Sequence, residues 1–286
     1  MDFWINQSFN AVSYAGLLFL LGGGMTLIFG VMKIVNIAHG GFYLIGGYLG
    51  YYIASTTGNF YLGLVGGSVG CAMAGMVFER WFLRELSGQM LRQMLMTMGI
   101  TLLIQDIIVI ISGGYSYTLE PPEWCNNVLE IGGYYFYMLR VFMIGAAVAV
   151  YILLWYVMEK TKVGAMIRAT VDNKAVAQTL GINVQLVSMG VFCLGAFLAA
   201  FAGVIGSAFT EISAGMDFEV LPLAFVVVIL GGMGSLKGAA VGALIVGFID
   251  NFARAMFPEL AYFSLFFPMV VILSIKPTGL FGREWL

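Results

Sequence analysis

The chain has 286 residues, of which 61% are hydrophobic and only 10% are charged, and its formal net charge is −2. Because a soluble protein carries about a quarter charged residues, this composition excludes a water-soluble protein and indicates one that crosses a membrane several times. The 38 glycines and a mean hydropathy of +0.96 favour membrane helices over a barrel, whose strands would alternate polar and apolar residues. We expect one all-α transmembrane domain over residues 1–286.

Nine apolar stretches approach the length needed to cross about 30 Å of hydrocarbon. They are Phe9–Met32, Ile37–Ala54, Phe60–Phe78, Gln93–Ile111, Tyr135–Met158, Leu186–Phe209, Val220–Leu230, Ala239–Phe257 and Tyr262–Ile275. Two of them, Val220–Leu230 and Tyr262–Ile275, are too short to cross alone and indicate broken or tilted segments. We therefore expect a polytopic helical bundle with broken helices and about 8–10 crossings.

Positive charges between these stretches gather in two loops, one after the third stretch and one over residues 159–185. These loops hold Arg80, Arg84, Arg92, Lys160, Lys162, Arg168 and Lys174. Both are predicted to be cytoplasmic, because basic residues concentrate on that side of a membrane. The acidic loops Ser112–Tyr134 and Thr210–Glu219 contain no base and are predicted to be external. Strict alternation then places the N-terminus in the periplasm and the C-terminus in the cytoplasm.

The stretch Gly30–Gly41 interrupts the first apolar region with three polar side chains, Lys33, Asn36 and His39. It is either a loop at the membrane surface or a helix broken inside the bilayer. A second glycine-rich interruption, Gly231–Gly238, likewise opens an apolar segment that is rich in glycine. Paired interrupted helices in the two halves of a chain are typical of a transport pathway, which favours the broken helix.

The basic segment over residues 159–185 has the composition of a helix. Ala165–Leu180 lacks Gly and Pro, Arg168 and Asp172 are four residues apart on one face, and Gly181 is placed to end a helix. This pattern predicts one short cytoplasmic helix that lies either in a groove of a soluble partner or on the lipid surface. Its apolar face is mostly Ala and Val, too small to anchor firmly in lipid, which favours the protein partner.

Four ionisable side chains fall within or beside the apolar stretches: Lys33, His39, Asp106 and Asp250. A charge at the membrane centre costs about 2.5 to 3.5 kcal/mol. We interpret Lys33 as an interfacial anchor, whereas His39 either lines a pathway or bonds backbone groups freed by the break. We expect Asp106 to be paired inside the bundle and Asp250 to pair with Arg254 near the outer surface.

The sequence contains no G-x-x-x-x-G-K-[ST] phosphate loop, no H-E-x-x-H or C-x-x-C metal motif and no G-x-S-x-G nucleophile turn. With a single histidine, neither a metal site nor a serine triad is expected. The chain is therefore predicted to be a transporter component without its own ATPase site, not an enzyme, and to bind no metal, cofactor or nucleic acid. Two classes remain open: a subunit energised by a partner, and a standalone channel or secondary transporter for a small neutral solute such as urea or a short amide.

Several motifs occur in a specific order. They are G-M-T-L-I-F-G-V-M-K-I-V-N-I-A-H-G-G-F from Gly24, R-A…D…L-G-I-N from Arg168 followed by F…G-A-F-L-A-A-F-A-G from Phe192, I-L-G-G-M-G-S-L-K-G from Ile229, and K-P-T-G-L-F-G from Lys276. In this order they make the chain resemble, nearly end to end, the permease subunits of ATP-binding-cassette importers for branched-chain amino acids, of the LivH type. One departure is Asp106, where the family commonly has Asn after the preceding Gln.

The resemblance implies half of a translocation pathway for leucine, isoleucine, valine or related small solutes in a bacterial inner membrane. It also implies four kinds of contact: a second homologous permease subunit, two cytoplasmic ATPase subunits that hold ATP and Mg²⁺, a periplasmic solute-binding protein, and membrane lipid. The residues implied to flank the pathway are Asn36, Ala38, His39, Gly40, Gly231, Gly232, Gly234 and Ser235. Those implied to contact the ATPase are Gly164, Arg168, Ala169, Asp172, Leu180 and Gly181, and the candidate intramembrane polar groups are Gln105 and Asp106.

Overall fold

The computed structural model describes residues 2–282 as a bundle of helices. The helices are α1 (Asp2–Met32), α2 (Ala38–Thr57), α3 (Phe60–Phe78), α4 (Met90–Ser112), α5 (Met138–Lys160), α6 (Lys162–Asp172), α7 (Lys174–Thr179), α8 (Val184–Phe209), α9 (Met216–Gly231), α10 (Leu236–Met256) and α11 (Ala261–Ile275). The π-helical turn η1 (Glu79–Leu83) continues α3, and η2 (Glu123–Asn126) and η3 (Pro258–Leu260) are short 3₁₀ turns. The expected helical fold class is confirmed.

Within residues 2–282, six helices are long and apolar enough to cross a membrane: α1, α3 with its π-helical turn, α4, α5, α8 and α10. The remaining three predicted stretches correspond to α2, α9 and α11. As expected for short segments, α9 has 16 residues and α11 has 15, and each contains a proline, Pro222 and Pro268 respectively. Since α9 begins at Met216, it includes four residues that the sequence analysis assigned to the preceding loop.

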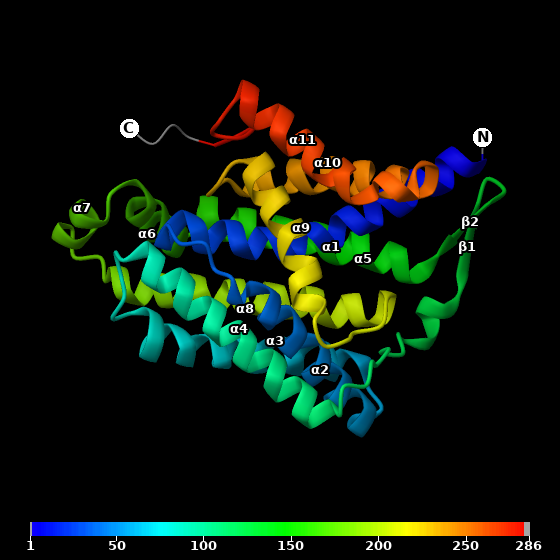
Figure 1. Cartoon of the computed structure of the whole chain (residues 1–286), viewed down its shortest axis with the longest axis horizontal. Coiled ribbons are helices and arrows are strands. Elements are labelled where there is room, and N and C mark those ends of the chain that lie inside the picture. Colours follow the sequence, from blue (N-terminus) through cyan, green and yellow to red (C-terminus); the bar gives the residue numbers. More distant parts are fainter. Residues whose placement is uncertain (1, 283–286) are drawn as a thin grey trace.

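The helix α1 runs through the centre of the bundle (Figure 1). It packs against α8 and α10, and 83% of its most apolar window is buried. The corresponding windows of α4 and α5 are only 28% and 17% buried. α4 and α5 are therefore peripheral, and most of their apolar surface faces away from the bundle.

Glycines bring α2, α3 and α8 into close contact. An added Cβ at Gly46 would overlap the backbone of Ala200 in α8, and one at Gly203 would overlap the carbonyl of Tyr43. In α3, an added Cβ at Gly67 would lie 2.9 Å from the carbonyl oxygen of Gly46. Small residues at such spacings let helix backbones approach closely. These small-residue motifs therefore pack the chain's own bundle.

A β-hairpin that the sequence analysis did not predict lies before α5. Its strands are β1 (Val128–Ile131) and β2 (Tyr134–Tyr137), which pair antiparallel. Gly132 and Gly133 form the two-residue turn with φ angles of 62° and 84°, as the hairpin turns that match strand twist require. The aromatic residues of β2 are apolar enough to extend the predicted fifth stretch to Tyr135, although α5 itself begins at Met138.

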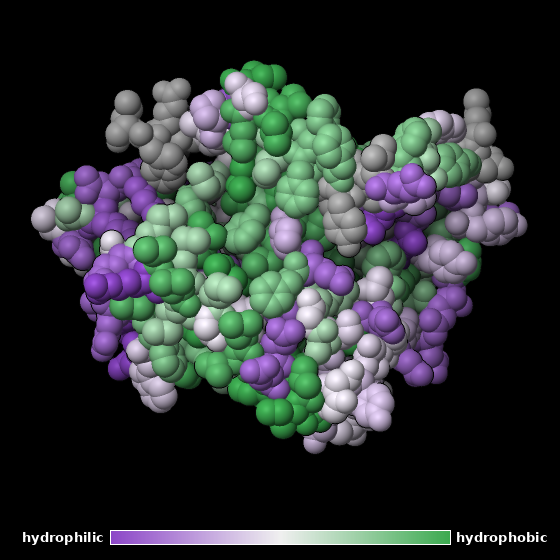
Figure 2. Space-filling model, in the orientation of Figure 1, coloured by the Kyte–Doolittle hydropathy of each residue, from purple (hydrophilic) through white to green (hydrophobic). Residues whose placement is uncertain are grey.

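The two ends of the bundle carry different features. Figure 1 places α6 and α7 at one end, and the start of α1 and the β-hairpin at the other. Figure 2 shows hydrophilic side chains gathered at both ends, with a largely hydrophobic band between them. This distribution is that of a protein that crosses a bilayer, with its polar ends in the aqueous phases.

Candidate functional site

The first polar interruption forms a break between α1 and α2. After Met32, the backbone N–H of Lys33 donates to the carbonyl of Phe29 at 2.8 Å. Lys33 has a φ of 57°, a left-handed conformation that is uncommon for residues other than glycine and is typical of the residue that ends a helix. The chain is then non-helical over residues 33–37, and α2 begins at Ala38.

The break returns the chain to the middle of the bundle. The Nε2 atom of His39 lies 2.8 Å from the carbonyl oxygen of Leu21, and the His39 side chain is fully buried. Leu21 precedes Met32 by 11 residues, which at 1.5 Å per residue is about 16 Å from the end of α1. The start of α2 therefore lies level with the middle of α1. The segment is a helix broken at membrane depth and not a surface loop.

Three buried polar side chains, in α1, in the break and in the first turn of α2, keep atoms without a hydrogen-bond partner among the described residues. They are Oγ1 of Thr26, both side-chain polar atoms of Asn36, and Nδ1 of His39. All three side chains are 0% exposed. Buried polar groups in proteins are normally paired, so the break offers unused donors and acceptors at membrane depth.

The beginning of α2 packs against the beginning of α9. An added Cβ at Gly40 would overlap the backbone carbonyl of Asp217. Asp217 is 1% exposed and lies in the first turn of α9, where the positive end of the helix dipole favours a carboxylate. Ala38 and Gly40, which were predicted to flank a pathway, are thus closely packed between helices and line neither of the cavities described below.

The second interruption joins α9 to α10. Gly232 and Gly234 have φ angles of 102° and 82°, which only glycine adopts readily. The hydroxyl oxygen of Ser235 accepts a hydrogen bond from the N–H of Gly238 at 3.1 Å and so caps α10. The second break therefore lies where the glycine-rich interruption predicted it.

The C-terminal segment closes the second break. The backbone N–H groups of Leu280 and Phe281 donate to the carbonyls of Leu230 and Gly231, both at 2.9 Å. These carbonyls lie at the end of α9, where no intrahelical donor follows. The K-P-T-G-L-F-G motif thus has a structural role, which is to donate hydrogen bonds to the free carbonyls at the buried end of a broken helix.

The structure does not bring the two breaks together. An added Cβ at Gly30 would lie 3.2 Å from Cα of Gly234, whereas His39 meets Leu21. Along α1 these two contact points are nine residues apart, or about 13 Å at 1.5 Å per residue. The first break therefore lies at mid-depth, and the second lies near the end of α1 at which α6 and α7 are found.

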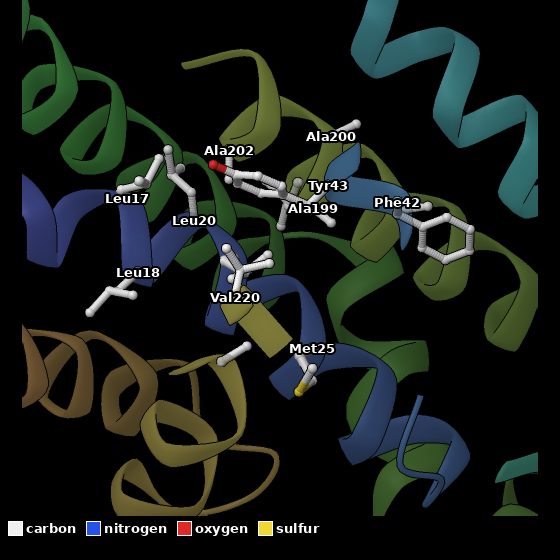
Figure 3. Packing of buried hydrophobic residues seen from close by; sticks show 14 of the residues in the cluster. Leu17, Leu18, Leu20, Met25, Phe42, Tyr43, Ala199, Ala200, Ala202 and Val220 are labelled. Carbon is white, nitrogen blue, oxygen red and sulfur yellow. The ribbon is translucent and has the colours of Figure 1, made fainter. Parts of the chain in front are cut away.

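A cavity of about 620 Å³ lies between α1, α9 and α10. Its apolar wall is formed by Leu17, Leu18 and Leu21 of α1 and by Leu223 of α9. Figure 3 shows Leu18 on the side of α1 that faces α9 and α10. This volume is in the range of sites for small molecules. Since Leu21 also bonds His39, the cavity ends at the depth of the first break. We call it the outer cavity.

One end of the outer cavity is charged. Nε of Arg254 donates to both carboxylate oxygens of Asp250 at 2.9 Å. The Asp250 side chain is 2% exposed, whereas 52% of the Arg254 side chain is exposed. Glu219 of α9 also lines the cavity. The predicted Asp250–Arg254 pair is confirmed, and the cavity combines an apolar wall with carboxylate and guanidinium groups.

The residues of the outer cavity were not predicted from the sequence. α1 is apolar on every side, so no periodicity distinguishes the side that faces α9 from the others. Asp217 and Glu219 were assigned to an external loop because they are acidic. Acidic residues directly before an apolar run are also a signal for the first turn of a helix, and that signal could have placed them in α9.

The helices α6 and α7 project beyond the membrane-spanning bundle. Thr161 caps α6 by accepting from the N–H of Gly164 at 3.2 Å, and an added Cβ at Gly164 would overlap carbonyls in the last turns of α5. A guanidinium nitrogen of Arg168 lies 4.0 Å from the carboxylate of Glu159. In contrast, Leu180 is 73% exposed at the end of α7. Of the residues predicted to contact the ATPase, Gly164 is therefore packed closely against α5, whereas Leu180 presents an exposed apolar side chain.

The prediction of a single helix in this segment is wrong, because Asn173 divides it in two. The side-chain oxygen of Asn173 accepts from the N–H groups of Ala175 and Val176 at 3.0 and 3.1 Å and so begins α7. Asn favours this capping role over a helix interior. Gly181 ends α7 as predicted, with a φ of 81° and its N–H donating to the carbonyl of Gln178 at 3.0 Å.

A second cavity, of about 480 Å³, lies where α7 meets the end of α1. We call it the inner cavity; Lys33, Gln93 and Lys174 are among its lining residues. Burial, and secondarily the nearby charge of Lys33, lower the pKa of Lys174. The two ammonium groups thus lie close enough to interact. Asp172 also lines the inner cavity, which therefore carries charges of both signs.

Gln105 and Asp106 are adjacent in α4 but point in different directions. An added Cβ at Gly215 would lie 3.9 Å from Nε2 of Gln105, so this side chain reaches the turn before α9. Asp106 is exposed, and no ion pair joins it to another residue between 2 and 282. The expectation that Asp106 is paired inside the bundle is therefore wrong.

The sequence matches the model of a family described as the permease component of a branched-chain amino acid transport system, over residues 7–275. The high-affinity branched-chain amino acid transport system permease protein LivH of Escherichia coli K12 is 26% identical over 98% of this chain and 96% of its own length. The corresponding protein BraD of Pseudomonas aeruginosa is 25% identical over the same shares. The ribose import permease protein RbsC of Haemophilus influenzae is 29% identical over 63% of this chain and 52% of its own.

A solved structure, PsaBC from Streptococcus pneumoniae in complex with Fab, matches with a TM-score of 0.52 and 12% identity, over 93% of this chain and 89% of that chain. At this identity the match concerns the fold alone. The family match covers nearly the whole chain and agrees with its apolar spans. The chain therefore belongs to the family of permease components of branched-chain amino acid transport systems and is a multi-pass inner-membrane subunit of an ATP-binding-cassette importer.

Proposed function

We propose that this subunit forms half of the translocation pathway for leucine, isoleucine and valine. The observation that carries the proposal is the outer cavity, which combines an apolar wall with the charged side chains of Glu219, Asp250 and Arg254. A branched-chain amino acid is an apolar side chain attached to a zwitterion. It therefore needs an apolar surface for one end and groups of both charges for the other.

On this proposal the solute passes from the outer cavity to the first break and then to the inner cavity. Leu21 belongs to the outer cavity and bonds His39, so the two features are adjacent. Asn36 and His39 would supply hydrogen bonds at mid-depth, where a polar solute has lost its water. Gly231, Gly232, Gly234 and Ser235 would hold the second break near the inner mouth of the pathway.

The partners follow from the two ends of the bundle. We propose that α6 and α7, through Gly164, Arg168, Ala169, Asp172, Leu180 and Gly181, dock on one of two cytoplasmic ATPase subunits that bind ATP and Mg²⁺. The N-terminus and the β-hairpin then lie in the periplasm, where a solute-binding protein delivers the solute. A second homologous permease subunit completes the pathway. The exposed apolar end of α7 and the basic residues at the same end of the bundle support this assignment of partners.

The outer cavity is tested by filling it. Leu223 is half-buried and lines the cavity, so Leu223→Trp should occupy the space a solute would use. In the assembled importer in proteoliposomes, we expect ATP-dependent leucine uptake to fall about tenfold or more, since 1.4 kcal/mol of lost affinity is a factor of ten. Leu153→Trp, on the exposed side of α5, is the control and should leave uptake unchanged. Wild-type uptake by Leu223→Trp would contradict the assignment of the cavity.

The same preparation addresses the standalone channel or secondary transporter for a small neutral solute. On our proposal, this chain alone in liposomes should not take up leucine or urea, and uptake by the complex should require ATP. Uptake of urea by the isolated chain without ATP would overturn the proposed function.

A further inference from the structure

Beyond Arg92 in its first turn, the outer side of α4 carries one charged group, a carboxylate, on an otherwise apolar surface. The exposed apolar side chains of this helix are Met90, Leu91, Leu95, Met98, Leu102, Leu103, Ile107, Val109, Ile110 and Ile111. Asp106 is exposed among them. Figure 2 shows that a hydrophilic patch interrupts the hydrophobic surface over the second half of α4. We call the surface formed by Leu103, Asp106, Ile107 and Ile110 the α4 face.

Asp106 lies too deep to reach the aqueous phase from lipid. It precedes Ser112, the last residue of α4, by six residues, or about 9 Å at 1.5 Å per residue. The short side chain of Asp cannot span that distance, unlike a lysine or arginine that extends toward the headgroups. A carboxylate facing hydrocarbon at this depth is strongly disfavoured. The α4 face is therefore covered by something other than lipid tails.

The chain itself does not neutralise this carboxylate. No ion pair among residues 2–282 involves Asp106. The neighbouring Gln105 turns inward to the loop before α9, so Asp106 points away from the bundle. A compensating group must come from another molecule.

The other peripheral spans are different. α3 contains no Asp, Glu, Lys or Arg over its whole length, and α5 contains none between Arg140 and Glu159. Their exposed side chains, such as Val65 in α3 and Leu153 in α5, match a lipid environment. Of these three helices, only α4 carries an ionisable group on its outer side at membrane depth.

We propose that the α4 face is the contact surface for the second permease subunit and that this subunit places a basic side chain opposite Asp106. The inference rests on the proposed function, which requires a second permease subunit, and it specifies where that subunit binds. A second copy of this chain, related by a two-fold axis along the membrane normal, would bring another Asp106 to the same depth. The complementary partner is therefore a different permease chain that supplies the positive charge.

Photo-crosslinking in the complete importer, in native membranes, tests the surface. Benzoylphenylalanine replaces Leu103 or Ile110 on the α4 face, and Leu153 on α5 in the matched control; Leu103 and Leu153 are 63% and 60% exposed. We expect a covalent product with a second permease chain from the two α4 positions and only lipid adducts from position 153. Mass spectrometry should locate the linked peptide in a helix that contains Lys or Arg.

Three results would overturn the inference. They are lipid adducts alone from both α4 positions, a product between two copies of this chain, or a permease product from position 153 only. If the wild-type chain purifies with no second permease and no ATPase, the proposed function itself fails. If the complex forms but the crosslinks lie elsewhere, only this inference fails.

Replacing the charge gives an independent test. Against lipid, Asp106→Leu would be favourable and would leave complex formation unchanged. If a basic side chain faces Asp106, the same change leaves that base unpaired, and recovery of the second permease subunit should fall about tenfold. Asp106→Glu should retain the complex, and the melting temperature of the isolated Asp106→Leu chain should not fall. Undiminished recovery of the partner with Asp106→Leu would contradict the assigned base.

Discussion

Single residues determine where the first break lies against the neighbouring helices. His39 bonds the carbonyl of Leu21 in the middle of α1, and Gly40 lets α2 touch the backbone of Asp217 in α9. A side chain at position 40 would push two helix starts apart at the depth where unpaired polar atoms of Asn36 and His39 are buried. The glycine next to the histidine therefore has a steric role that is as important as the polar side chains.

The smallest side chain that tests this contact is alanine. We expect Gly40→Ala to destabilise the protein by about 1–3 kcal/mol, because a methyl group enters a closely packed contact with backbone that cannot move aside easily. Gly99→Ala in α4 is the matched control: nothing lies within 4 Å of an added Cβ there, so the change should be neutral or slightly stabilising. Thermal unfolding in detergent measures both. Equal melting temperatures for the two variants would show that the α2–α9 contact is looser than described.

At the scale of elements, the segment over residues 159–185 is two helices with defined ends. Asn173 begins α7, and Gly181 ends it with a φ of 81°. The exposed end at Leu180 and the partly exposed Arg168 lie on these two short helices. A docking surface built this way depends on the ends of the helices as much as on the side chains between them.

Two variants test the coupling surface. Gly181→Pro cannot adopt a φ of 81° and loses the N–H that donates to Gln178, while Arg168→Glu reverses the charge on α6. We expect each to reduce co-purification of the ATPase and ATP-dependent uptake about tenfold. Arg92→Glu, an exposed charge reversal near the start of α4, serves as the control and should retain both. If ATPase recruitment and uptake survive both changes, the coupling surface lies elsewhere.

At the scale of the whole molecule, the segments that connect the helices lie at one or the other of the two ends of the bundle. The α2–α3 turn, the β-hairpin and the N-terminus belong to one end, and α6, α7 and the turn before α4 to the other (Figure 1). The basic residues concentrate at the second end, so we expect that end to be cytoplasmic.

Cysteine labelling checks this orientation. The native Cys71 and Cys125 are buried, so only Cys193 needs replacement by serine. Thr57→Cys at the α2–α3 turn should react with a membrane-impermeant maleimide in intact spheroplasts. Ser87→Cys before α4 should react only after the membrane is opened. The opposite pattern would reverse the predicted sidedness of every loop.

The sequence by itself determined the spans, their expected sidedness and the positions of the two breaks. Each of these depends on composition and spacing along the chain: apolar length sets a span, Lys and Arg set its orientation, and Gly232 and Gly234 permit backbone conformations closed to other residues. The hairpin at Gly132 and the cap at Asn173 were also encoded locally, by a two-glycine turn and a capping amide. Neither was predicted, because strand β2 is apolar enough to be read as part of a span and the segment around Asn173 has the composition of one continuous helix.

Only the tertiary structure decided how deep the first break lies, which helices form the outer cavity, and that Asp106 points outward. These properties depend on which side of a helix faces which neighbour. In a helix such as α1, which is apolar on all sides, no periodicity records that choice. Backbone contacts between small residues, such as Gly40 with Asp217 and Gly30 with Gly234, set it instead. Those contacts join residues that are far apart in the chain, so they become visible only when the helices are packed.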